Sequence, residues 1–343
     1  MRRDTDMRYW VVWLAGLLVL FSASSLPATQ QLPEWMGPPS VGPPPVAEFS
    51  SDEPCAPLYR RGGGLSFFAG YMDHAKGLNL SFDPTTNGYQ PDVLLERWQH
   101  NYPLRGLWLS LEADLPLPAG LGFYASGSYL FPSVVYSEEF VSLETDRGSR
   151  SWSTSTQWFT VDAAGSYSAN EAVRILGGVR YESLFTKFFN PSNTVNLAAL
   201  PTDDAEVNLS LIIPYVGLAV GQGSGRSGMK LRALISPYIA GDVVYGETYG
   251  IGEGDTGSRN EVRGGLDRGY FLELTAEALY GPGGGTLMFG AFGKYQYLHA
   301  RGELPGEYHS AGLPTASDRF QFGVLRQAWV VGGVASLNFA SPF

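Results

Sequence analysis

Apolar and polar residues alternate with a period of two along most of the chain beyond residue 60. In the segment 105–115, RGLWLSLEADL, Leu109 and Leu111 fall on one face and Glu112 falls on the other. A β-strand directs successive side chains to opposite sides of its sheet, so such a segment has one apolar and one polar face. The alternation therefore predicts an all-β chain.

The alternation recurs in ten segments, which are joined by connections of two kinds. Tight turns such as PLPAG, 116–120, alternate with much longer connections such as 73–103. An even number of antiparallel strands can close into a barrel, and a sheet in a bilayer must close because every backbone polar group needs an internal partner. We expect an antiparallel up-and-down transmembrane β-barrel with short periplasmic turns and long external loops. The expected strands are 65–72, 105–115, 120–131, 157–167, 172–182, 207–220, 229–242, 270–280, 286–297 and 329–339.

Two features fit this prediction poorly. Pro214 and Pro237 lie inside expected strands, where proline removes a donor from the ladder. In the sixth strand the alternation assigns Ile212, Val216 and Leu218 to the interior, which is otherwise polar. Alternation alone does not say whether an apolar face meets lipid or a protein core, so a soluble β-sandwich or barrel stays open as the alternative.

The C-terminal segment WVVGGVASLNFASPF contains the last expected strand. Trp329 opens this strand, Phe339 ends it, and Phe343 ends the sequence. Here the chain resembles the Gram-negative outer-membrane β-barrel proteins as a class, many of which finish on an aromatic residue in a closing strand. The resemblance implies a place in the outer membrane, contact with its lipid, and recognition of this strand by the barrel-assembly machinery. Because Ala340, Ser341 and Pro342 intervene, either phenylalanine is a candidate for the recognised terminus.

The N-terminal residues have the pattern of an export signal. A basic start that includes Arg2 precedes an apolar stretch, 10–21, that is too short to span a bilayer as a helix. The proline-rich segment that follows favours an extended, polyproline-like spacer. We expect a signal peptide at 1–28, a Pro-rich periplasmic segment at 29–59 and the outer-membrane barrel at 60–343, reached by export through the periplasm.

The composition and net charge of the chain limit the classes of partner that it can bind. Charged residues make up 16% of the 343, well below the quarter typical of a soluble domain, and the formal net charge is -10. An acidic exported chain is not a nucleic-acid binder through its overall field. The single cysteine, Cys55, cannot form an internal disulfide.

Charged residues on the polar faces of the strands are the candidate functional residues. In a narrow barrel, opposed charges most simply pair and fill the interior, because an unpaired buried charge is costly. We therefore favour a structural or surface-exposed barrel with a charge-filled lumen. The alternative is a small porin-like channel whose charged lining selects solutes. The expected lumen charges are Glu112, Asp114, Asp162, Arg174, Arg180, Glu182, Lys230, Arg232, Asp242, Glu273, Glu277 and Lys294.

No motif indicates a catalytic, cofactor or metal site. Two GxGxxG matches, 223–228 and 252–257, precede no helical pattern and are interpreted as turn and loop glycines. A third class stays open, a rim-active outer-membrane hydrolase that is omptin-like or lipid-modifying, since omptins are also ten-stranded and use acidic residues with a histidine near the outer rim. Asp73 and His74 are the first pair to test for it. The external loops suit water or a partner, and their ligand is left unspecified.

Overall fold

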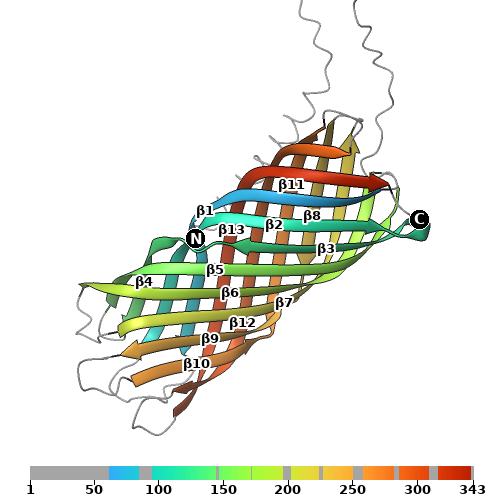
Figure 1. Ribbon diagram of the computed structural model, residues 1–343. Coiled ribbons are helices and arrows are strands. Elements are labelled where there is room, and N and C mark those ends of the chain that lie inside the picture. The colour runs from blue at the N-terminus through green and yellow to red at the C-terminus, as the bar shows by residue number, and fades with distance from the viewer. Residues whose placement is uncertain are drawn as a thin grey trace, which may run out of the picture. The chain divides into compact units, whose positions relative to one another are not determined.

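The computed structural model describes residues 62–84, 95–143, 147–170, 172–195, 202–223, 227–249, 258–281, 286–308 and 316–340, and these form a single antiparallel sheet (Figure 1). The segments predicted as signal peptide, 1–28, and Pro-rich spacer, 29–59, lie outside the described residues. Among the described residues, no helix is long and apolar enough to cross a membrane.

The sheet contains thirteen strand segments and one short 3-10 turn, η1 (Pro118–Gly120). The strands are β1 (Gly62–Pro84), β2 (Leu95–Pro116), β3 (Leu121–Leu130), β4 (Val134–Leu143), β5 (Arg147–Ser168), β6 (Val173–Val195), β7 (Thr202–Gly223), β8 (Ser227–Ser236), β9 (Ala240–Tyr249), β10 (Ser258–Leu266), β11 (Arg268–Tyr280), β12 (Leu287–Tyr308) and β13 (Ala316–Ala340).

Three pairs of segments are single strands interrupted by a break, so the thirteen segments make ten strands. β4 continues β3 between the same neighbours, β9 continues β8 along β7, and β11 continues β10. Each strand pairs antiparallel with the next, and β13 pairs with β1, which closes the sheet. The predicted all-β, ten-stranded antiparallel barrel is confirmed.

Alternation sorts the side chains between the outer and inner surfaces of this barrel. On β1, Leu65, Phe67 and Tyr71 are exposed, whereas Phe68 and Met72 are buried. The exposed residues lie on the outer surface and the buried ones inside, as a strand period of two requires. Outward-facing Leu, Phe, Val and Ile recur on nearly every strand, and an apolar outer surface of this kind suits contact with lipid.

The strands are much longer than the alternation indicated. β13 has 25 residues and β1 has 23, while a strand of about 9–11 residues crosses a bilayer. Much of the expected loop 73–103 is therefore strand, and pairing continues as far as Pro84↔Phe320. These extensions were missed because segments such as 147–156, RGSRSWSTST, are polar on both faces and carry no period-two signal, although their backbones still pair.

An extra residue at the break between β8 and β9 reverses the alternation. Three residues of β7, 213–215, face four residues, 236–239, between the pairs Val216↔Ile235 and Ile212↔Ala240. This is a β-bulge, and a one-residue insertion transfers every later side chain to the other face. Pro237 lies in the break and Pro214 directly opposite it, where the β8–β9 side has no regular ladder to be interrupted.

The predicted orientation of the sixth strand, now β7, is wrong. Ile212, Val216 and Leu218 are about half exposed on the outer surface, whereas Ile213 and Tyr215 are buried inside. From 211 to 220 the strand is apolar on both faces, and the polar residues before it, Glu206, Asn208 and Ser210, share the outward face of Ile212, so the alternation assigned that face to the interior. Pairing with β6 fixes it instead: Arg180, which points inward, lies opposite Ile213.

A glycine accommodates the break between β3 and β4. Gly106 of β2 has φ of +153°, and a Cβ there would lie 2.6 Å from the carbonyl oxygen of Phe131. The backbone N–H of Phe131 donates to the carbonyl of Leu107 at 2.9 Å, so this close approach is part of the ladder.

We predict that Gly106→Ala lowers the free energy of unfolding by about 1–3 kcal/mol, because alanine is strained at this φ and clashes with a backbone oxygen. The measurement is equilibrium urea unfolding of the refolded protein in detergent. Gly165→Ala is the control, since nothing lies within 4 Å of a Cβ at that position. Equal stability of the two variants would contradict the prediction.

Candidate functional site

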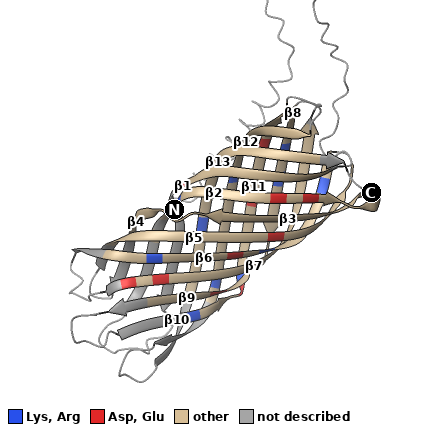
Figure 2. Ribbon diagram, in the orientation of Figure 1, with Lys and Arg blue, Asp and Glu red and all other residues tan. Residues whose placement is uncertain are grey.

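The charged residues on the strands gather inside the barrel. Lys, Arg, Asp and Glu occupy few positions along the described strands, and the other residues there are uncharged (Figure 2). The structure places eleven of the twelve expected lumen charges on the inner surface, where they contact one another or line a common cavity; Asp242 is the exception. "Turn end" denotes here the barrel end that carries η1 and the tight turn 169–172, and "far end" the opposite one.

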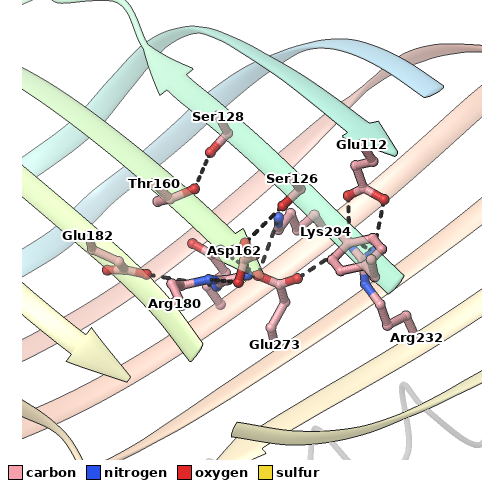
Figure 3. A network of polar contacts seen from close by, with 12 residues as sticks. Glu112, Ser126, Ser128, Thr160, Asp162, Arg180, Glu182, Arg232, Glu273 and Lys294 are labelled. Atoms are coloured by element: carbon pink, nitrogen blue, oxygen red, sulfur yellow. Dashed lines mark hydrogen bonds and ion pairs between the residues drawn. The ribbon is translucent and has the colours of Figure 1, made fainter. Parts of the chain in front are cut away.

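Arg180 of β6 is the centre of the network (Figure 3). Its Nε and Nη2 donate to the two carboxylate oxygens of Asp162, at 2.8 and 3.1 Å, directly across the β5–β6 ladder. Its Nη1 donates to Oε2 of Glu273 on β11 at 2.7 Å and lies 3.8 Å from Oε1 of Glu182. The guanidinium stacks 4.8 Å above the ring of Phe271. With Arg180 only 1% exposed, three carboxylates replace the water that the cation lost.

Glu273 is the matching anionic centre. It is fully buried, and its Oε2 accepts from Arg180 and from Nε2 of Gln296 at 2.7 Å, with Nζ of Lys294 at 3.2 Å. Its Oε1 lies 3.6 Å from Nη2 of Arg232. One carboxylate thus joins cations from β6, β8 and β12.

A second arginine bridges opposite walls of the barrel. Nη1 and Nη2 of Arg232 on β8 donate to the two oxygens of Glu112 on β2, at 2.8 and 2.7 Å. β2 and β8 are five strands apart in the ring of ten, so this bidentate pair crosses the lumen. Nη1 also donates to the hydroxyl of Tyr124 at 2.6 Å, which fixes the guanidinium further.

Arg326 of β13 forms a third crossing pair, which the alternation did not identify. It is ion-paired with Glu182 of β6 on the opposite wall, with Nη2 donating to Oε1 at 3.1 Å, and its guanidinium lies 4.1 Å from the ring of Trp158. Both charges are 1% exposed. The expected last strand began at Trp329, three residues after Arg326, whereas β13 begins at Ala316; the alternation Phe322, Val324, Arg326 was the signal that could have extended it.

The inner charges balance within the described part of the chain. Six carboxylates face six basic groups, so the charged layer is neutral as a whole. The acidic members are Glu112, Asp114, Asp162, Glu182, Glu273 and Glu277, and the basic ones are Arg174, Arg180, Lys230, Arg232, Lys294 and Arg326.

Apolar side chains fill the lumen both within the charged layer and beyond it. Toward the far end, Trp152 and Phe188 pack with ring centroids 6.0 Å apart and are at most 1% exposed. At the level of the charges, Phe292 lies opposite Glu277 in the β11–β12 ladder and packs edge-on against Phe68 at 5.1 Å and beside Trp108 at 5.6 Å. This interior is packed like a protein core.

A small cavity remains at the turn end. Its volume is about 70 Å³, and its lining includes the Arg232–Glu112 pair, Lys230 and Glu277. Glu277 is 7% exposed, and its Oε2 has no hydrogen-bond partner among the described residues. Because the Arg232–Glu112 pair is part of this lining, the cavity borders the charged network directly.

Asp242 does not belong to the lumen, contrary to the prediction. It is exposed on the outer surface, while its neighbour Val243 is buried inside. Up to Ser236 the even-numbered residues face inward, and beyond the bulge the odd-numbered ones do. A strand drawn straight through Pro237 therefore assigned Asp242 to the wrong face.

Among the described residues, those considered for a rim activity do not form a common site. Nε and Nη2 of Arg105 lie 3.0 and 2.9 Å from Oδ1 of Asp73. Nε2 of His299 accepts from Nε of Arg301 at 3.2 Å. Outside the described part of the chain lie His309 and the side chains of His74 and His100. The same holds for Phe343 and for the side chain of Phe339. Trp329, the third residue expected in the closing strand, faces outward beside Tyr295. Among the described residues, no three His, Cys, Asp or Glu side chains are placed to hold a metal ion.

We predict that Arg326→Met lowers the free energy of unfolding by about 3–5 kcal/mol, because it leaves Glu182 buried without its crossing partner. Adding Glu182→Met should recover a large part of the loss, since both charges are then gone. The exposed pair supplies the control: Arg105→Met should cost less than about 1 kcal/mol. Urea unfolding gives all four values, and a small effect of Arg326→Met would show that the crossing pair contributes little.

Comparison with known proteins reveals likeness in structure alone. No protein-family model and no curated protein matches the sequence. The outer membrane protease OmpT of Escherichia coli is similar in structure, with a TM-score of 0.59 and 9% identity over 83% of this chain and 98% of that one. The translocator domain of the autotransporter NalP of Neisseria meningitidis gives 0.36 at 10% identity, covering 80% and 88%, and OprG of Pseudomonas aeruginosa gives 0.32 at 12%, covering 81% and 97%. The likeness to OmpT therefore shows that the described chain, a closed barrel of ten strands, has a fold found among the Gram-negative outer-membrane β-barrel proteins.

Proposed function

We propose that this protein is a closed outer-membrane barrel whose role is structural or surface-exposed and whose lumen does not conduct. The observation that carries the proposal is the pair of ion bridges across the lumen, Arg232–Glu112 and Arg326–Glu182, each between strands on opposite walls. Side chains that meet in the middle of a barrel fill the space that a solute needs.

Burial favours this reading over a porin-like channel. Charges that line a water-filled pore keep much of their hydration, so they are accessible to solvent. Arg180, Glu182 and Glu273 are instead at most 1% exposed, and each is bonded to an opposite charge. Their number and balance suit a barrel that is held together from within.

The lengths of the strands support a role at the surface. β12 and β13, with 22 and 25 residues, continue well beyond the thickness that a bilayer needs. With the tight turns on the periplasmic side, this excess projects outward, as a wall on which external contacts can form. We also propose that 1–28 direct the export on which this placement depends.

We further propose that the barrel is not an enzyme. Likeness to a protease at 9% identity concerns the fold, and activity depends on particular residues. Asp73, the carboxylate first considered for a rim site, accepts from Nε of Arg105 at 3.0 Å, so one of its oxygens is already held in an ion pair.

The test is single-channel recording of the refolded protein in a planar bilayer, with heat-modifiable gel migration as proof of folding. We predict no conductance steps from the folded wild type. Glu273→Gln and Arg232→Gln should each lower the free energy of unfolding by about 3 kcal/mol or more without opening a pore, because Trp152 and Phe188 still fill the lumen toward the far end.

The matched control for these variants is Lys187→Gln, which removes an outward-facing cation 3.5 Å from Asp204 and should leave stability nearly unchanged. Reproducible steps from folded wild type, with a selectivity that changes in Glu273→Gln, would overturn the closed-barrel proposal in favour of a channel.

A further inference from the structure

Two arginines face each other on the outer surface of the barrel. Arg268 of β11 and Arg301 of β12 are directly opposite in the ladder. Both are exposed, whereas Ala300 beside Arg301 and Phe271 further along β11 are buried inside. Like charges opposite each other on one face destabilise a sheet, so this pair needs an explanation.

The surrounding described residues compensate this repulsion only weakly. Arg268 has one acidic neighbour, Asp267, with Nε and Oδ1 3.6 Å apart and side chains that are 76% and 64% exposed, and a contact so open to water is weak. Nε of Arg301 donates to Nε2 of His299. A histidine ring that accepts a hydrogen bond is neutral, so this contact adds no negative charge beside Arg301.

Two other outward-facing cations, Arg105 and Lys187, each have a carboxylate partner. Arg105 lies directly opposite Asp73 in the β1–β2 ladder and contacts it at 2.9 Å. Lys187 lies 3.5 Å from Asp204 on the neighbouring strand. Both have a carboxylate on an adjacent strand, and the Arg268–Arg301 pair has a second cation in that position instead.

The arginine pair lies next to an aromatic group on the same outer surface. Tyr270 and Tyr297 stack with centroids 5.6 Å apart, Tyr270 also contacts His299 at 5.3 Å, and Tyr295 packs against Trp329 at 4.4 Å. Tyrosine and tryptophan mark the interface of a bilayer with water. Arg268 and Arg301 are the next outward-facing residues toward the far end, which is the depth of lipid headgroups.

We propose that Arg268 and Arg301 bind a phosphate group of a lipid in the outer leaflet. A phosphate between the two guanidinium groups replaces their repulsion with charge-assisted hydrogen bonds, and the planar fork of arginine matches phosphate oxygens. The Nε contact with His299 orients Arg301, and among the described residues it leaves the terminal nitrogens of Arg301 for the ligand. The proposal concerns the outer surface alone and does not depend on whether the lumen conducts.

The probe is phosphatidic acid, a lipid with a terminal phosphate monoester, incorporated into detergent micelles that contain the folded full chain. Its affinity is compared with that of phosphatidylcholine by native mass spectrometry of lipid adducts. We expect the wild type to prefer phosphatidic acid by about tenfold or more, and R268Q/R301Q to lose that preference. The single variants Arg268→Gln and Arg301→Gln test the same point if the double variant folds poorly.

R105Q/K187Q is the matched control, because it also removes two outward-facing positive charges but leaves the arginine pair intact. It should retain the preference for phosphatidic acid. Equal loss in both double variants would overturn the proposal, since the preference would then follow from net charge. Equal binding of the two lipids by wild type would also overturn it.

Thermal unfolding gives a second, independent readout. Without phosphate, Arg268→Gln should leave the Tm unchanged or raise it, because it removes a repulsion; with phosphatidic acid present, wild type should be the more stable of the two. A variant that is less stable under both conditions would point to a structural role and contradict the proposal. Displacement of the lipid by inorganic phosphate at similar concentration would assign the site to a soluble anion instead.

Discussion

The need of every backbone polar group for a partner determines the rest of this structure. In lipid a sheet meets that need only by closing, and here β13 closes against β1 over most of its length. Closure of ten strands leaves a narrow interior into which every second side chain points. Charges placed there have little water, so they must pair with one another, and the network around Arg180 and Glu273 is the result.

The breaks in the strands are part of the same arrangement. At the β8–β9 bulge, one extra residue exchanges the two faces, which transfers Asp242 to the outer surface and leaves Val243 inside. The far half of the lumen can thus be apolar although the strands that build it are not uniformly so. Trp152 and Phe188 occupy that half, above the charged layer.

The sequence sufficed for the architecture and for eleven of the twelve inward charges, but not for their pairing. Period-two alternation identified ten strands and most of the inward charges, because Arg180 and Glu182 are polar positions in an otherwise apolar strand. It did not reveal which charges meet, since Arg232 and Glu112 are 120 residues apart and their contact depends on the curvature of the whole sheet. It failed at Asp242, where an inserted residue reverses the alternation, and at Ile212, where the polar residues earlier in β7 share the outward face. It missed Arg326 because the polar outer part of β13 hid the start of the strand.

The crossing pairs bear on how such a barrel can be assembled. Arg326 and Glu182 are separated by 144 residues, and Arg232 and Glu112 by 120, so neither pair exists until strands from both halves of the chain have come together. A single hairpin inserted alone into lipid would present its inward charges to hydrocarbon, at a cost of several kcal/mol for each. The charges are tolerated only if they remain in water until the ring is nearly complete. The lumen therefore favours a route in which the sheet curls before it is fully surrounded by lipid, and it disfavours insertion one hairpin at a time.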